Sequence, residues 1–133
     1  MSQARAIEIM STYLNDVVGK GDIGLIEDFT AADFVDHTQL ELRGPAALTA
    51  HVQNFRGNIP DLRVEVLGIS ANDDTAFGIW RWHGTPVDPV WGKSATGETI
   101  VPSLIGSYFR IENDMLAEYQ PFIDAMDVLG QLT

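Results

Sequence analysis

Apolar side chains in the N-terminal part of the chain recur at the three- and four-residue spacing of a helix. The first such stretch covers residues 7–18 and ends before two glycines, Gly19 and Gly21. The pattern predicts one helix that packs on a core along a single stripe. The residues expected to face inward are Ile7, Met10, Leu14, Val17 and Val18.

Two further helices are predicted in the first half of the chain. A short one covers residues 23–29, and Thr30 is expected to cap one more helical turn through residue 33. The third begins at Gly44-Pro45 and ends near Gly57, since proline is favoured at the first helical position. Its inward stripe is expected to be Leu48, Val52 and Phe55, with His51 at the rim.

The second half of the chain alternates apolar and polar residues, which is the pattern of β-strands. Strands are predicted over residues 62–71, 75–85, 98–112 and 115–123. The turn clusters Asn72-Asp73-Asp74 and Asn113-Asp114 join them as hairpins. A stretch rich in Pro and Gly, residues 85–97, separates the second and third strands.

Helices followed by long antiparallel strands predict an α+β domain. A curved antiparallel sheet closed by the N-terminal helices forms a cone, and a cone offers a ligand pocket. Trp80 and Trp82 are two residues apart in a predicted strand, so they face the same side of the sheet. We expect at least one of them to line the pocket, where a flat aromatic ligand can stack on it.

The composition is that of a folded acidic domain. The chain has 133 residues, of which 45% are hydrophobic and 20% charged, with a formal net charge of -11. This length is typical of one domain, so residues 1–133 are expected to form a single unit. The negative charge disfavours nucleic acid and anionic membranes as partners. The absence of cysteine excludes disulfides, thiolate metal sites and a Cys nucleophile.

Sequence motifs for cofactors, metals or export are not found. The N-terminus has no basic stretch followed by a long apolar run, so a cytoplasmic location is expected. His37, His51 and His83 form no His-x-x-x-His pair, and no acidic cluster has the spacing of a calcium loop. A glycine-rich phosphate loop is missing as well, so we expect no cofactor.

Several short motifs occur in an order that resembles a known family. They are Asp33-Phe34-Val35-Asp36-His37, Ile59-Pro60-Asp61-Leu62-Arg63-Val64-Glu65-Val66, Gly84-Thr85, Ala95-Thr96-Gly97 and Phe109-Arg110-Ile111-Glu112. Near the C-terminus, Asp124 stands seven residues before Gln131-Leu132. Together they resemble the SnoaL-like polyketide cyclases of the nuclear transport factor 2-like superfamily, over roughly residues 7–133. The resemblance implies a conical α+β barrel and a homodimer.

The same resemblance implies a cofactor-independent cyclase that acts on an aromatic polyketide intermediate in antibiotic biosynthesis. In such enzymes a pocket carboxylate removes an acidic proton between two carbonyl groups, and the carbanion closes a ring by aldol condensation. The matching position here is Asp124, which is therefore the expected catalytic residue. Strand alternation would then place Phe122 and Gln120 on the same inward face of the strand as Asp124. Asp127 is the competing carboxylate.

A developing enolate or alkoxide needs hydrogen-bond donors. The candidates are His37, Tyr108 and Gln120, and for His37 a structural role is an equally good interpretation. Trp80 and Trp82 complete the expected substrate-binding set, with core packing as the alternative for either indole. His83 alternates away from them and is expected on the outer face.

Two departures from the family pattern keep other functions open. Pro86 follows Gly84-Thr85, where many members carry His, and Tyr119-Gln120 follows Glu118, where His-Trp is common. A hydroxylase component that needs a reductase partner, an isomerase and a non-catalytic binding module of the same fold are the alternatives. An epoxide hydrolase is less favoured, because Arg110 and Asp124 supply only part of its Asp–Arg–Asp arrangement.

Overall fold

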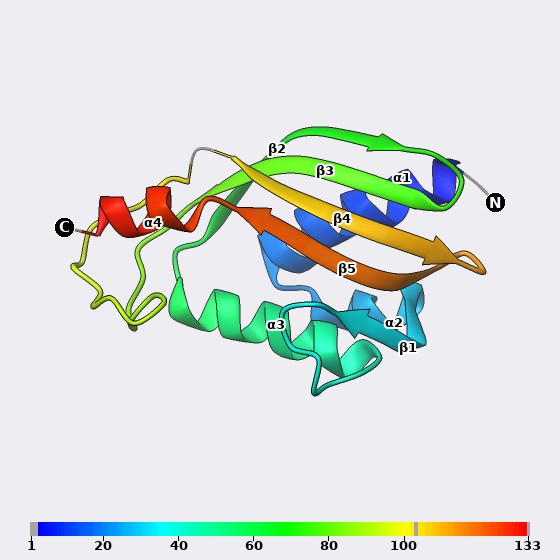
Figure 1. Ribbon diagram of the computed structural model, residues 1–133, viewed down its shortest axis with the longest axis horizontal. Coiled ribbons are helices and arrows are strands. Elements are labelled where there is room, and N and C mark those ends of the chain that lie inside the picture. Colours follow the sequence, from blue (N-terminus) through cyan, green and yellow to red (C-terminus); the bar gives the residue numbers. More distant parts are fainter. Residues whose placement is uncertain (1–2, 103, 133) are drawn as a thin grey trace.

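The computed structural model describes residues 3–102 and 104–132, which form a five-stranded sheet with helices packed on one face (Figure 1). The helical segments are α1 (Gln3–Thr12), the π-helix η1 (Tyr13–Val18), the 3-10 turn η2 (Ile23–Leu25), α2 (Ile26–Phe29), α3 (Pro45–Asn58) and α4 (Ala125–Gln131). The strands are β1 (Thr30–Asp36), β2 (Arg63–Ala71), β3 (Thr75–His83), β4 (Ile105–Glu112) and β5 (Met115–Ile123). Within the described ranges, no helix is both long and apolar enough to cross a membrane.

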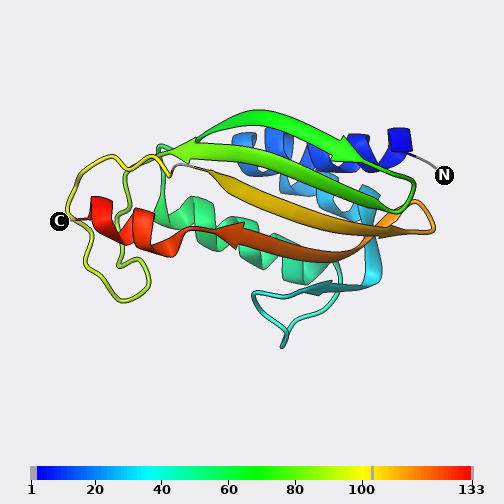
Figure 2. The same cartoon turned by 45° about the horizontal axis from the view of Figure 1, so that its top comes forward.

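The sheet has the strand order β1-β5-β4-β3-β2. β1 runs parallel to β5, and the other neighbours are antiparallel. Register shifts between Val66 and Gly68 and between Arg110 and Ile111 interrupt the ladders, and such bulges add twist and bend to a sheet. The sheet lies across α1 and α3 (Figure 2), with α1 against β2 and β3 and α3 against β1. The predicted α+β architecture with a curved sheet is confirmed.

One apolar core fills the space between sheet and helices. Aromatic rings form its centre, where Tyr13 meets Phe109 and Phe109 meets Tyr119 with ring centroids 5.2 and 5.4 Å apart. The stripe predicted for the first helix is correct except at one end. Ile7 is 38% exposed and Ile9 is buried in its place. The helix also changes from α to π at Tyr13, and Tyr13 is buried in the core.

Residues 30–33 form part of strand β1, so the helical turn predicted there was wrong. β1 lies beside β5 with Thr30 opposite Leu116 and Asp36 opposite Tyr119. Pairing with β5 gives hydrogen-bond partners to backbone N–H and C=O groups that a lone turn would leave to water. This gain outweighs the local preference of the residues for a helical turn. A short local sequence cannot show that a strand more than eighty residues away offers its edge.

β4 begins at Ile105, seven residues later than predicted. Residues 84–102 form a loop that is closed at its base by an isolated bridge between Gly84 and Ile100. Pro102 has no N–H to give to a ladder, which favours the late start of the strand. The loop lies beside α4 at one end of the sheet (Figure 1), where Gln131 bonds the backbone of Val101.

Gly44→Ala is expected to lower the free energy of unfolding by about 2 kcal/mol or more. Gly44 precedes α3 with a φ of 71°, and a Cβ there would lie 2.6 Å from the carbonyl oxygen of Ala32. Gly57→Ala, near the end of the same helix, is the matched control. A Cβ at Gly57 meets nothing within 4 Å, so we expect a gain of about 0.5–1 kcal/mol. Urea unfolding measures both, and equal effects would contradict this account.

Candidate active site

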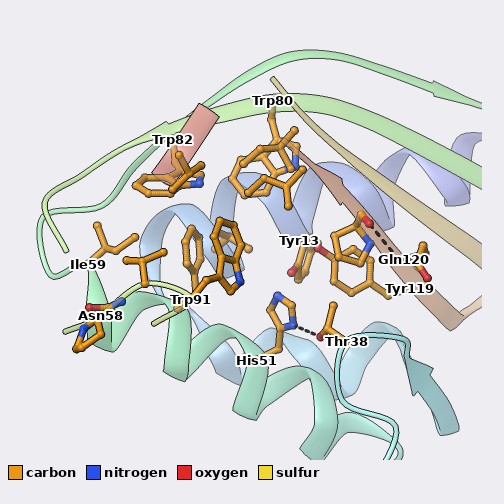
Figure 3. A pocket seen from close by; sticks show the side chains of 18 residues that line it. Tyr13, Thr38, His51, Asn58, Ile59, Trp80, Trp82, Trp91, Tyr119 and Gln120 are labelled. Atoms are coloured by element: carbon orange, nitrogen blue, oxygen red, sulfur yellow. Dashed lines mark hydrogen bonds between the residues drawn. The ribbon is translucent and has the colours of Figure 1, made fainter. Parts of the chain in front are cut away.

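A cavity of about 550 Å³ lies between the sheet, α3 and the loop of residues 84–102. Its volume is within the range of small-molecule sites, and most of its lining is aromatic or aliphatic. Figure 3 shows Trp80 and Trp82 of β3 on one side and His51 of α3 on the other. The cavity thus has apolar walls and a small number of polar groups.

A buried aspartate–histidine pair is the main polar feature of this cavity. Asp36 ends β1 with no exposed surface, and its Oδ2 accepts a hydrogen bond from Nδ1 of His51 at 2.9 Å. His51 lies three residues after Leu48 and four before Phe55, so it belongs to the core-facing stripe of α3. Because Nδ1 donates to Asp36, the opposite ring nitrogen Nε2 remains as the acceptor on a side chain that lines the cavity.

Further donors surround the carboxylate of Asp36. The backbone N–H and the hydroxyl of Thr38 donate to Oδ1 at 2.8 and 2.6 Å, and the amide of Gln39 donates to Oδ2 at 3.3 Å. Burial disfavours the charged form, but the bonds from His51 and Thr38 outweigh it and lower the pKa of Asp36. Asp36 is therefore an ionised, fully bonded group that can hold an imidazole in place.

Two buried tyrosines lie beside the pair. The ring of Tyr119 is 5.4 Å from that of His51 and 5.7 Å from that of Tyr13. Tyr119 is hydrogen-bonded to Ser107 and Tyr13, and Ser107 accepts a bond from Nε1 of Trp80 at 3.0 Å. Burial raises the pKa of Tyr119 to about 12 and that of Tyr13 well above its usual value. Both phenols stay protonated, and because Tyr13 donates to Tyr119, the O–H of Tyr119 is the one left to donate further.

Three of the predicted substrate-binding residues line the cavity. They are Trp80, Trp82 and Gln120 (Figure 3). Phe55 packs edge-on against both indoles, with ring centroids 6.5 Å from Trp80 and 5.4 Å from Trp82. The amide of Gln120 donates to the carbonyl oxygen of Pro121 at 3.1 Å. The role of these residues in binding stays a prediction.

The other predicted residues are not part of the cavity lining. His37 bonds Glu118, which also accepts from Nε of Arg110 at 2.8 Å. Tyr108 lies opposite the partly exposed Phe77 and lines a separate shallow depression with it.

Asp124 is exposed and caps α4, where its Oδ1 accepts the backbone N–H of Asp127 at 3.1 Å. It lies one residue beyond the end of β5, so strand alternation does not set its direction. Phe122 was expected to face inward, but it is 55% exposed and packs with Phe77 on the outer face. That expectation for Phe122 was therefore wrong.

Sequence reasoning missed the Asp36–His51 pair, although a signal for each residue was present. Asp36 lies two residues after the apolar Phe34, which is buried in β1, so both side chains face the same side of the strand. The signal was lost because this segment was interpreted in part as a helical turn. His51 falls on the apolar stripe predicted for α3, yet it was placed at the rim. In the described part of the chain, no group of three or more His, Asp or Glu side chains is placed to hold a metal ion.

The fold, a bent sheet with helices packed on one face, is that of the nuclear transport factor 2-like superfamily. The family model of the SnoaL-like polyketide cyclases matches residues 8–132, and the chain belongs to this family. Among curated proteins, none matches the sequence significantly.

Solved structures agree with this fold. TsrD from Streptomyces laurentii superimposes with a TM-score of 0.87 at 19% identity, covering 99% of this chain and 97% of its own. A SnoaL-like polyketide cyclase from Agrobacterium tumefaciens superimposes with a TM-score of 0.83 at 15% identity, covering 96% and 98%. At these identities the likeness shows the fold.

Asp36→Asn is expected to make the free energy of unfolding fall less steeply as the pH is lowered. The pKa of Asp36 is lower in the folded state than in the unfolded state, so its ionised form stabilises the fold. This contribution is present above the unfolded pKa of about 3.9 and is lost as the pH falls through the lower folded value. Urea unfolding at a series of pH values from about 6 to 2 measures the slope.

Thr38→Val is the graded comparison, because it removes one donor and keeps the carboxylate. The free energy of unfolding that this variant loses on acidification should lie between the losses of the wild type and of Asp36→Asn. An unchanged slope in Asp36→Asn would contradict the assigned ionisation of Asp36.

Proposed function

We propose that this protein is a cofactor-independent cyclase that closes a ring of an aromatic polyketide by intramolecular aldol condensation. His51 is the general base, and Asp36 positions it. The observation that carries the proposal is the 2.9 Å bond from His51 Nδ1 to the buried Asp36, on the wall of an apolar cavity. Membership of the SnoaL-like polyketide cyclase family supports the reaction class.

The first step is removal of a proton from a carbon between two carbonyl groups. Nε2 of neutral His51 takes the proton, and the carboxylate of Asp36 stabilises the imidazolium that forms. The electron pair spreads onto a carbonyl oxygen as an enolate. Tyr119 supplies a neutral O–H donor beside His51, Tyr13 donates to Tyr119 from behind, and a donor already in place stabilises such an anion without reorganisation.

The second step forms the ring. The enolate carbon attacks a ketone carbon of the same molecule, a C–C bond forms, and the electron pair of the C=O bond moves to oxygen. The resulting alkoxide takes the proton back from Nε2 of His51. The product is an isomer of the substrate and His51 is neutral again, so the step consumes no co-reactant. Trp80 and Trp82 provide apolar wall for a flat substrate.

The carboxylate implied by the family resemblance, Asp124, has different surroundings from His51. It is exposed and bonded to the backbone of Asp127, and a carboxylate in water is a weak base for a carbon acid. Its position at the start of α4 supports a capping role. The assignments to His51 and Asp124 therefore predict opposite results for one pair of variants.

His51→Asn is expected to lower kcat by about 10²–10⁴-fold with the fold intact. Asparagine keeps an N–H donor near the position of Nδ1 and removes the group at Nε2. Asp36→Asn should lower kcat by about 10²-fold or more, because an amide N–H facing Nδ1 favours the wrong tautomer of His51. The measurement is turnover of a linear polyketide β-diketone, followed by liquid chromatography and mass spectrometry.

His83→Gln is the control for loss of an imidazole, since His83 faces Glu65 across β2 and β3 at 3.6 Å, away from the cavity. It should keep the wild-type rate. A normal rate in His51→Asn together with a collapse in Asp124→Asn would refute the proposal and support Asp124 as the base.

The product separates the remaining alternatives. An isomer of the substrate that contains a new ring indicates ring closure, and an isomer without a new ring would indicate an isomerase. A product with one added oxygen atom, formed only with oxygen and a reductant, would instead indicate a hydroxylase component. Binding of the substrate without turnover would indicate a binding module.

A further inference from the structure

We infer that Trp91 is a substrate-binding residue that covers the cavity and clamps a planar aromatic ligand against the indoles of β3. The inference rests on the proposed function only in taking this cavity as the substrate site. Trp91 belongs to the loop of residues 84–102 and lines the cavity. Figure 3 shows it on the opposite side of the cavity from Trp80 and Trp82.

Trp91 differs from the other two tryptophans in its exposure. Trp80 and Trp82 are each 4% exposed and pack on Phe55, so they belong to the core as well as to the cavity. Trp91 is 56% exposed. A large apolar side chain that leaves most of its surface in water does little for the fold, but that surface is available to a ligand.

The backbone at Trp91 is also unfavourable for the residue it carries. Val90 and Lys93 pair through backbone bonds of 2.8 and 2.9 Å, and the two residues between them, Trp91 and Gly92, have φ values of 46° and 83°. A two-residue turn with both φ positive favours Asn-Gly, and a bulky residue at its first position is strained. Strain of this kind persists where function requires the side chain.

Contacts on both sides hold this turn in place over the cavity. Nζ of Lys93 donates to the carbonyl oxygen of Leu129 in α4 at 2.8 Å. On the other side, the side chain of Asn58 accepts the backbone N–H groups of Val87 and Asp88 at 3.1 and 2.7 Å. The indole is therefore positioned before a ligand arrives, which limits the conformational entropy lost on binding.

The lining of the cavity defines the chemistry of the ligand. Indoles on two opposite sides suit a flat ring system, which offers both of its faces for stacking. Among the described residues that line the cavity there is no Lys or Arg, so an anionic ligand would gain no ion pair there. A planar, uncharged aromatic compound fits both observations.

Trp91→Asn tests the inference with two readouts that should move in opposite directions. The variant is expected to raise the thermal midpoint Tm by a few degrees, because Asn suits the positive φ. It should also raise the Kd for the planar anthraquinone emodin about tenfold, in mildly acidic buffer that keeps the phenols of emodin protonated, because the stacking surface is lost. Calorimetric titration of the purified protein with emodin gives Kd, and thermal unfolding followed by circular dichroism gives Tm.

Trp91→Phe keeps an aromatic ring and should hold Kd within about threefold of wild type. Asn113→Gly is the matched control, since it alters the other turn with consecutive positive φ values, far from the cavity lining, and should leave Kd unchanged. An unchanged Kd in Trp91→Asn, a fall in its Tm, or no binding of emodin to the wild type would each overturn the inference. Neither readout uses turnover, so failure of the cyclase proposal would be seen separately.

Discussion

The charge of Asp36 is held inside the protein by hydrogen-bond donors from two separate segments. Thr38 and Gln39 follow β1 directly, whereas His51 comes from α3. Breaking a buried pair by removing one partner typically costs about 3–5 kcal/mol, so these segments are not free to move independently. The parallel pairing of β1 with β5 and the rotation of α3 about its axis are both required to complete this one set of bonds.

Strand alternation places a second acid–histidine pair directly behind the first. Asp36 and Tyr119 lie opposite each other and face the interior, while their neighbours His37 and Glu118 bond on the other face. Hydrogen bonds from Arg110 and His37 lower the pKa of Glu118, so its carboxylate is ionised like that of Asp36. It remains partly open to water. Only the inner pair combines a bonded imidazole with an apolar, enclosed space, which is why the chemistry is assigned to His51.

Local sequence patterns predict some side-chain directions in the site correctly and others not. The two-residue spacing of Trp80 and Trp82 was enough to predict that they share a face of the sheet. The order of motifs that resembles the family was enough to predict a pocket. The same rule did not apply to Asp124, and Phe122 was assigned to the wrong face because its direction was counted back from Asp124. The strand ends at Ile123, and a helix cap then sets the direction of the next side chain. Residues at the ends of elements depend on where the element stops, which periodicity does not specify.

The sequence by itself determined the class of fold, because the two periods of apolar residues fix where helices and strands form and therefore how they layer. The acidic composition and the lack of cysteine also restricted the chemistry to oxygen and nitrogen groups. Only the tertiary structure decided which of those groups meet. Thr30–Asp36 became a strand because β5 offered it an edge, and that pairing directed Asp36 toward His51 of α3. Contacts between segments distant in sequence depend on the whole packed arrangement, which no local pattern contains.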